Sequence, residues 1–470
     1  MITTDTLVTA PSGVKYLWDD EHKWMTQIPE NCVFHKGITG CGATTLAIKQ
    51  PGNTILAMPF QELIDNKVAS NPNLLGIHGG MERETEIAKY IKSHDQHKIA
   101  VTYDSFPLVC DVLIDLGLDP YKDYFLFVDE WHILFNSYKF RNKAARKLLD
   151  RSKEFQSKTF VSATPIPREY WLTELQDIPE YRIEWPGAST VNINSIKVPD
   201  PLDYMARLCK SRANKGGYDN YHIFLNSVEG IIRIIKLAGL TQAQCRIVCS
   251  QSSEDTRKRN QKKLGEFQIQ KTTDPVKLFN FYTSTCFEGQ DIMDPVGRTF
   301  IVSEACKDHT KLDVMTSLLQ ICGRVRDSEF KTEINQFYAQ SDYKDVSLEE
   351  FRENQQRQIA DAEHDAELLN ELSEGGKKLI KRYVNKAPYL GVDEETGQII
   401  VDRNLANFDI VNYGIINGQY KTQCNMNNAL SKAGFHVTND TGAYNTDEEL
   451  ENLTSIEKTP FKDFSRNMPK

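Results

Sequence analysis

Short apolar runs alternate with longer polar or amphipathic stretches along the first part of the chain. Five runs have the composition of buried strands: Cys32–Phe34, Thr54–Pro59, Ile99–Tyr103, Tyr124–Val128 and Thr159–Val161. Strands that alternate with helical stretches indicate a parallel α/β sheet. Prolines at 165, 167, 179 and 186 then interrupt the pattern. We therefore expect a domain boundary near residues 185–200.

The same pattern restarts after this boundary. Four further strands are predicted, at Tyr221–Leu225, Arg246–Cys249, Lys277–Tyr282 and Phe300–Ser303. The first is followed by a helical run over Val228–Leu240, and another helical stretch begins at Lys311 and carries Gln320–Arg326. The predicted fold class is therefore α/β, with two tandem parallel-sheet domains.

The last third has a different pattern. Ser347-Leu348-Glu349-Glu350 fits a capping box, and the polar stretch from there to Leu372 predicts an exposed or interdomain helix. Thr396-Gly397 and Asn417-Gly418 predict hairpins over Gly391–Val401 and Ile410–Tyr420. The expected domains are an N-terminal extension (1–27), two α/β domains (28–190 and 191–340) and a smaller mixed α+β region (341–470) that ends in a loose acidic tail.

Composition narrows the class of protein. The 470 residues carry a net charge of −9, which argues against wholesale coating of nucleic acid but leaves room for a local basic channel. The basic clusters at 139–151 and 257–263 are interpreted as solvated helix faces. No apolar run is long enough to span a membrane. Ten scattered cysteines indicate reduced thiols in a cytosol-like compartment.

The segment Gly37–Thr45 has the glycine spacing of a phosphate-binding loop, G-x-x-x-x-G-K-[ST], with Ala43 in place of the lysine. It follows a predicted strand and leads into a helical stretch, which is the context of such a loop. Glycines let backbone N–H groups approach a phosphate, and Thr44 would place its hydroxyl on Mg²⁺. The candidate nucleotide-binding residues here are Gly37, Thr39, Gly40, Gly42, Ala43, Thr44 and Thr45.

An acidic pair follows the strongest predicted strand. Asp129 and Glu130 come directly after Tyr124–Val128, about 85 residues beyond the glycine loop. An apolar strand that ends in two acids is suited to hold hydrated Mg²⁺ beside a phosphate loop. We expect Asp129 to hold the metal ion and Glu130 to orient and deprotonate the attacking water. Ser162-Ala163-Thr164 follows the next strand and could link a nucleotide site to a nucleic-acid track.

Five segments, taken in order, resemble the motifs of superfamily 2 helicases and translocases in the D-E-x-H form. They are Gly37–Thr45, Asp129–His132, Ser162–Thr164, Thr283–Asp291 and Gln320–Arg326. The resemblance covers about residues 30–335. The forms G-A-T-T, T-S-T-x-F-E-G-x-D and Q-I-C-G-R-x-R are also similar to those of helicases from tailed phages and mobile elements of gut bacteria, and to viral origin-binding helicases.

This resemblance implies two RecA-like domains that hold ATP and Mg²⁺ between them while single-stranded or partly duplex nucleic acid crosses both. Gly289 and Asp291 match a nucleotide-sensing loop, and Gln320, Arg324 and Arg326 match the arginine-finger segment. That segment is one residue shorter than the family's G-R-x-x-R, and we favour Arg326 over Arg324 as the finger. The implied nucleic-acid contacts are Thr102, Tyr103, Ser105, Phe224, Asn226, Ser227, Thr283 and Thr285, and the implied coupling residues are His132, Ser162 and Thr164.

Three interpretations of Ala43 compete. Lys36, directly before the first glycine, could replace the missing lysine, because a four-carbon side chain could bring its ammonium to the phosphates. Alternatively, Ala43 is an engineered replacement, or the site binds nucleotide without hydrolysing it. Retention of Glu130, Arg324 and Arg326 argues against a site without hydrolysis, and we rank compensation by Lys36 first. Lys36 as an ordinary surface lysine stays an alternative.

The sequence thus supports three functional hypotheses. The first is an ATP-dependent helicase or translocase in the cytoplasm of a bacterial host, acting on DNA or RNA. The second is a nucleic-acid clamp or virion component that uses ATP without net hydrolysis. The third is the motor subunit of a larger replication or restriction assembly, with residues 341–470 as the adaptor. Replication or virion proteins of a phage are the expected protein partners, and no membrane is expected.

Overall fold

The computed structural model describes residues 4–441 of the chain with short gaps, and the chain divides into two compact units. The gaps are residues 19–23, 80–81, 137, 165, 169–170, 187–189, 251–253, 288–290, 305, 342–344, 374, 377–379, 381–383, 385–386 and 394–395. Unit 1 comprises residues 1–189, 313–320 and 343–419, and unit 2 comprises residues 190–312, 321–342 and 420–470. The expected acidic tail beyond residue 441 lies outside the described residues.

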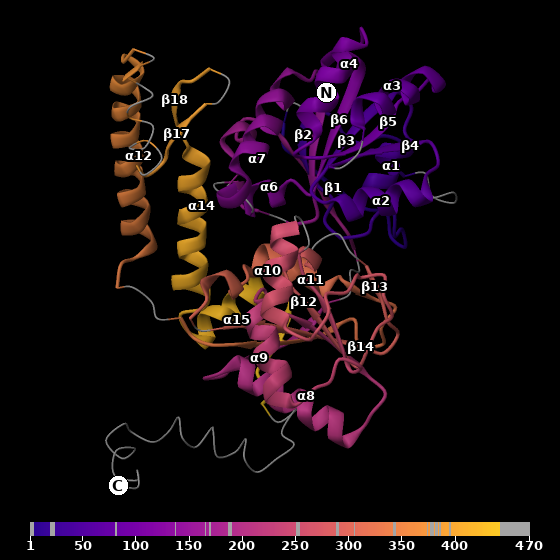
Figure 1. Ribbon diagram of the computed structural model, residues 1–470, viewed down its shortest axis with the longest axis vertical. Helices are drawn as coiled ribbons and strands as arrows, with labels where there is room; N and C mark the ends of the chain where they lie inside the picture. Colours follow the sequence, from indigo (N-terminus) through magenta and orange to yellow (C-terminus); the bar gives the residue numbers. More distant parts are fainter. Residues whose placement is uncertain are drawn as a thin grey trace. The chain divides into compact units, whose positions relative to one another are not determined.

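Unit 1 is built on an eight-stranded sheet in the order β1-β8-β2-β7-β6-β3-β5-β4. Figure 1 labels β1 to β6 of this sheet. Every neighbouring pair of strands is parallel. The strands are β1 Thr6–Thr9, β2 Cys32–His35, β3 Asn53–Met58, β4 Leu74–Ile77, β5 Lys98–Thr102, β6 Tyr124–Asp129, β7 Ser157–Ser162 and β8 Glu180–Glu184. Strand β7 therefore lies between β2, which precedes the glycine loop, and β6, which ends at the acidic pair.

Helices cover both faces of this sheet because successive strand residues point to opposite sides. Val33 packs with residues of α3, α4, α6 and α7, whereas Phe34 packs with residues of α1 and α2. The helices are α1 Ala43–Lys49, α2 Gln61–Ser70, α3 Arg83–Ser93, α4 Phe106–Asp115, α5 Pro120–Asp123, α6 His132–Asn136 and α7 Tyr138–Glu154.

The later part of unit 1 contains α12 (Leu348–Asn370), the antiparallel pair β17 (Leu390–Val392) and β18 (Ile399–Val401), and α14 (Arg403–Gly414). The predicted capping box at Ser347 and Glu350 is confirmed. So is the hairpin over Gly391–Val401.

The second predicted hairpin, over Ile410–Tyr420, is wrong. This segment continues α14 to Gly414 and then forms a π-helix over Ile415–Gln419. Ala406, Ile410 and Tyr413 are buried at a spacing of three to four residues, so the apolar period is helical. The Asn417-Gly418 pair lies within the π-helical turn, not in a two-residue hairpin loop.

Unit 2 contains a seven-stranded sheet in the order β11-β12-β10-β14-β16-β9-β19, again with parallel pairs throughout. The strands are β9 Asn192–Lys197, β10 Asn220–Phe224, β11 Cys245–Val248, β12 Phe279–Tyr282, β14 Gly297–Ser303, β16 Glu333–Tyr338 and β19 His436–Thr438. The helices are α8 Pro201–Lys215, α9 Val228–Ala238, α10 Glu254–Leu264 and α15 Gln423–Lys432. A short helix, α11 (Leu319–Cys322), belongs to unit 1 up to Gln320 and to unit 2 from Ile321. The predicted fold class, α/β with two tandem parallel sheets, is confirmed.

Candidate functional site

The glycine loop joins β2 to α1 through three glycines with positive φ. Gly37, Gly40 and Gly42 have φ values of 77°, 74° and 86°. Such backbone angles favour glycine over residues that carry a Cβ. A Cβ on Gly37 would also lie 2.4 Å from the carbonyl oxygen of Ile183 and 2.8 Å from Cδ1 of Trp185. The strand, loop and helix that the glycine spacing predicts are therefore present, and the loop backbone is held closely at its first glycine.

The acidic pair lies at the end of β6, next to this loop. The hydroxyl of Thr44, in the first turn of α1, donates to Asp129 Oδ2 at 2.9 Å. Glu130 has a left-handed backbone with φ of 51°. The Tyr103 hydroxyl donates to the carbonyl oxygen of Asp129 and lies 3.3 Å from that of Glu130. Tyr103 therefore supports the backbone that presents both carboxylates.

Lys36 points its ammonium into the same site. Its Nζ lies 2.8 Å from Glu130 Oε1 and 3.6 Å from Asp129 Oδ1. The residue is 5% exposed, so it is not a surface lysine. Burial by itself lowers the pKa of Lys36, but the charges of Glu130 and Asp129 outweigh it and hold the pKa above its ordinary value. The site thus contains a buried cation, supplied from the residue before the first glycine.

Ala43 occupies the position where the motif has lysine. It is 3% exposed and belongs to the same apolar cluster as Phe34 and Leu46. Its methyl group contributes no charge to the site. Lys36 is the lysine that the structure brings to the acidic pair.

The predicted coupling residues form a continuous chain behind Glu130. His132 Nδ1 lies 3.4 Å from Glu130 Oε2 and 2.8 Å from the Ser162 hydroxyl. That hydroxyl accepts from the Thr164 N–H at 2.8 Å. The Thr164 hydroxyl in turn accepts from Gln320 Nε2 at 2.7 Å. Because Gln320 is 1% exposed, its amide is fixed within unit 1 and linked through three side chains to the acidic pair.

Arg324 and Arg326 lie in unit 2, and contrary to the sequence prediction neither is in a helix. Helix α11 ends at Cys322, and Val325–Arg326 forms strand β15, which pairs in parallel with β13 (Ile292–Met293). This pairing places Arg326 Nε 3.0 Å from Asp291 Oδ1, and Arg324 is 4% exposed. The two-residue strand needs an extended backbone, which ends the helix earlier than the apolar pattern indicated. The predicted Gly289 lies outside the described residues.

The predicted nucleic-acid residues of unit 1 follow strand β5. The Thr102 hydroxyl donates to Ser105 Oγ at 3.1 Å, and Ser105 is 3% exposed. Tyr103 is buried behind the acidic pair. Its side chain is therefore directed to the backbone of Asp129, not to the surface.

In unit 2 the corresponding residues follow β10 and β12. Asn226 Nδ2 donates to the carbonyl oxygen of His309 at 3.0 Å, and the Asn226 amide oxygen accepts from the Ser284 N–H at 3.2 Å. Ser227 Oγ caps α9 and accepts from Lys307 Nζ at 3.1 Å, while Phe224 is fully buried. The hydroxyls of Thr283 and Thr285 lie 3.3 Å apart. These residues therefore share the edge of the sheet at which the parallel strands end.

The donor set fits a magnesium ion bound together with a nucleotide. Asp129 Oδ1 is buried and has no hydrogen-bond partner within the described part of the chain. Burial raises the pKa of Asp129, and the charge of Lys36 opposes this shift. Within the described residues no group of three or more His, Cys, Asp or Glu side chains could hold a metal ion by itself. Mg²⁺ commonly binds through one or two protein oxygens plus water and phosphate, so Asp129 and Thr44 suffice as protein ligands.

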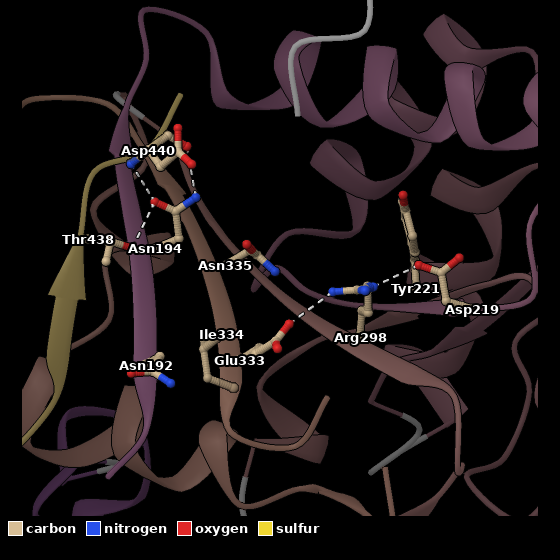
Figure 2. Close-up of a pocket in the computed structure, with 10 residues that line it drawn as sticks. All are labelled: Asn192, Asn194, Asp219, Tyr221, Arg298, Glu333, Ile334, Asn335, Thr438 and Asp440. Carbon is tan, nitrogen blue, oxygen red and sulfur yellow. Dashed lines mark hydrogen bonds and ion pairs between the residues drawn. The ribbon is translucent and has the colours of Figure 1, made fainter. Parts of the chain in front are cut away.

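A separate cavity of about 440 Å³ lies where several strands of the unit 2 sheet begin, at the edge opposite to that of Asn226 and Thr283 (Figure 2). Its lining includes Asn192 and Glu333, the first residues of β9 and β16. Arg298 bridges Asp219 and Glu333 there, at 2.8 and 3.2 Å. Because the predicted motif residues of unit 2 follow the other ends of the strands, this cavity is not part of the candidate site.

Two residues that support the site were not foreseen. The family resemblance predicts Tyr103 at the nucleic acid, and no sequence motif includes Trp185. Trp185 Nε1 donates to the carbonyl oxygen of Lys36 at 2.7 Å. Both side chains act on backbone carbonyls, which no spacing of residue types reveals.

No family model matches this chain, and neither does any curated protein. Solved structures with partial similarity include Mycobacterium smegmatis helicase Lhr bound to ssDNA and AMP-PNP, with 15% identity, a TM-score of 0.42, and coverage of 80% of this chain and 57% of the Lhr chain. A variant of S. cerevisiae Dbp5 bound to a Gle1 variant and IP6 has 12% identity and a TM-score of 0.41, covering 66% of this chain and 78% of that chain. RecG bound to a three-way DNA junction has 18% identity and a TM-score of 0.39, covering 68% of this chain and 41% of that chain. This chain thus spans little more than half of the Lhr chain.

No helix within the described ranges combines the length and the apolar character that crossing a membrane requires.

Proposed function

We propose that this chain is an ATP hydrolase of superfamily 2, a helicase or translocase that moves along single-stranded DNA or RNA. One observation carries the nucleotide part of the proposal. Next to a loop with three positive-φ glycines, Lys36 forms ion pairs with Glu130 and Asp129, and Asp129 accepts a hydrogen bond from Thr44. The order of the five motif segments supports the nucleic-acid part.

Each residue of the site has a distinct proposed role. The loop from Gly37 to Thr45 would surround the phosphates with backbone N–H groups. Asp129 and Thr44 would hold Mg²⁺, whose charge neutralises phosphate oxygens when it is bound. Lys36 would turn from Glu130 toward the phosphates and supply the cation that Ala43 lacks. Glu130, released from that ion pair, would accept a proton from the attacking water.

The remaining motif residues are proposed to complete the hydrolytic cycle. Arg326, with Arg324 as the alternative, would stabilise charge that develops on the terminal phosphate. Gly289 and Asp291 would sense the nucleotide, and Asp291 is also the ion-pair partner of Arg326. Hydrolysis would be coupled to the residues that contact nucleic acid through the side chains of Gln320, Thr164, Ser162 and His132. Thr102, Ser105, Asn226, Ser227, Thr283 and Thr285 are the proposed backbone contacts on that track, because such contacts follow phosphates without reading sequence.

The ion pair between Lys36 and Glu130 also favours a second candidate function. If Lys36 stays on Glu130 after ATP binds, the base is unavailable and the chain would act as an ATP-dependent clamp on nucleic acid. Motor and clamp differ in whether phosphate is released. A motor subunit of a replication or restriction assembly differs from both, because it would release phosphate only when its partner is added.

The test measures phosphate release by the purified chain with Mg²⁺ and ATP, in the presence of single-stranded DNA or RNA. The motor proposal expects release that nucleic acid stimulates and that Glu130→Gln lowers by about a hundredfold or more. Glu62→Gln, an exposed acid in the first turn of α2, is the matched control and should leave the rate unchanged. ATP-dependent retention on nucleic acid without phosphate release would instead establish the clamp.

A further inference from the structure

The backbone of Lys36 is fixed at both its amide and its carbonyl group. The N–H donates to the carbonyl oxygen of Ser162 at 3.0 Å. The carbonyl oxygen accepts from the Ile38 N–H at 2.9 Å and from the indole N–H of Trp185 at 2.7 Å. The first two hydrogen bonds join backbone groups to each other. The third comes from a side chain about 150 residues away in sequence, so its strength can be changed without altering the loop.

Trp185 follows strand β8, which lies beside β2 in the sheet. Its ring lies against Gly37, because a Cβ there would be 2.8 Å from Trp185 Cδ1. On another side the ring packs against Trp24, with ring centroids 5.7 Å apart and an edge-to-face angle of 78°. The indole is therefore held between the first glycine of the loop and a second aromatic ring, with its N–H directed at Lys36.

The location of Lys36 makes this support important. A lysine within the loop motif would start from the first turn of α1, whereas Lys36 starts at the end of β2, where the chain enters the loop. Its ammonium reaches Glu130 and Asp129 through four flexible methylene groups. A fixed Cα position reduces the freedom that this side chain has to lose when it binds a phosphate.

We propose that Trp185 is a positioning residue that sets Lys36 for nucleotide binding through the hydrogen bond to its carbonyl group. This inference rests on the proposed function, since it takes Lys36 as the cation that meets the phosphates. Trp185 does not itself touch the nucleotide. Its effect on nucleotide affinity therefore passes through the Lys36 ammonium and depends on that ammonium being present.

The test measures equilibrium binding of the non-hydrolysable ATP analogue AMP-PNP, with Mg²⁺, to the full-length chain. Trp185→Phe keeps an aromatic ring against Gly37 and removes the N–H. We expect it to raise the Kd about three- to tenfold, the range associated with one hydrogen bond. Trp24→Phe is the matched control, because Trp24 packs on the same ring and makes no hydrogen bond to Lys36 among the described contacts; it should leave the Kd unchanged.

A second background separates positioning from general structural support. In Lys36→Ala, Trp185→Phe should cause no further loss of AMP-PNP affinity, because the group it positions is gone. An equal loss in both backgrounds, or an unchanged Kd for Trp185→Phe in the parent chain, would overturn the inference and leave the proposed function standing. Absence of AMP-PNP binding by the parent chain would overturn the proposed function and the inference with it.

Discussion

Lys36 Nζ lies 2.8 Å from Glu130 Oε1; the Lys36 side chain is 7% exposed and that of Glu130 is 14% exposed. A largely buried pair of this kind is costly to break from one side, because the remaining charge is left without a partner. This ion pair connects the glycine loop, which lacks its usual lysine, to Glu130, the acid that would activate water. The two segments are far apart in the sequence.

The first prediction concerns the stability of this ion pair. Lys36→Ala should lower the free energy of unfolding by about 3 kcal/mol or more, because it leaves the buried Asp129 and the partly buried Glu130 as adjacent like charges. Adding Glu130→Gln to Lys36→Ala should recover part of this loss. Denaturant unfolding of the two single variants and the double variant gives the coupling energy. A coupling energy near zero would contradict a direct interaction between the two side chains.

The second prediction concerns pH and Asp129. Burial raises the pKa of Asp129 in the folded state, partly offset by Lys36. The folded state therefore holds this proton more tightly than the unfolded chain, and the contribution to stability falls as pH rises from the ordinary aspartate pKa of about 3.9 through the raised value. Asp129→Asn should thus raise the Tm at pH 7 by about 2 °C or more without nucleotide. It should also abolish Mg²⁺-dependent phosphate release.

The comparison with acidic pH checks this assignment. Near pH 3 the parent chain is protonated at Asp129 in both states, so the difference in Tm between the parent and Asp129→Asn should shrink. A difference in Tm that does not change with pH would mean that the carboxylate charge is not its cause.

A third prediction uses two glycines with similar backbone angles. Gly37 has φ of 77° and its Cβ position is blocked by Ile183 and Trp185, whereas Gly13 has φ of 86° and open space around it. Gly13→Ala should cost about 1–2 kcal/mol, the cost of a left-handed backbone alone. Gly37→Ala should cost clearly more and weaken nucleotide binding as well. Equal losses of stability in the two variants would show that the contacts with Ile183 and Trp185 have no effect.

A fourth prediction separates two roles for Tyr103. Its hydroxyl donates to the Asp129 carbonyl group beside the left-handed Glu130. Tyr103→Phe should lower phosphate release about threefold to tenfold, in line with the loss of one hydrogen bond. The affinity for single-stranded nucleic acid, measured without nucleotide, should stay unchanged. Weaker nucleic-acid binding at an unchanged rate of phosphate release would instead show that Tyr103 contacts the nucleic acid, as the family resemblance implies.

The apolar strand pattern predicted much of the fold. The mainly apolar runs correspond to β2, β3, β5, β6 and β7, and their predicted ends lie within two residues of the observed ends. The apolar pattern does not predict β1, β4, β8, β9, β13, β15, β16 or β19. In β8 and β9 the reason is clear, because Glu-Tyr-Arg-Ile-Glu and Asn-Ile-Asn-Ser-Ile-Lys carry polar residues at half of their positions or more. Their pairing depends on the neighbouring strands, which lie far away in sequence.

The candidate site was predictable where side chains themselves carry the chemistry. Thr44, Asp129 and Glu130 were found from motif spacing, and the structure brings them together with Lys36. Trp185 and Tyr103 act on main-chain carbonyl groups, whose positions only the folded chain reveals. The end of α11 at Cys322 could not be predicted from the local sequence either, because it depends on the pairing of β13 with β15, which lie about 30 residues apart.

Whether Lys36 replaces the loop lysine in ATP hydrolysis is tested by measuring nucleic-acid-stimulated phosphate release in three chains: the parent sequence, Lys36→Ala and Ala43→Lys. We expect the parent chain to release phosphate and Lys36→Ala to lower the rate about a hundredfold or more, because a preorganised charge is removed from the transition state. An unchanged rate in Lys36→Ala, or release by Ala43→Lys with an inactive parent chain, would contradict this role of Lys36.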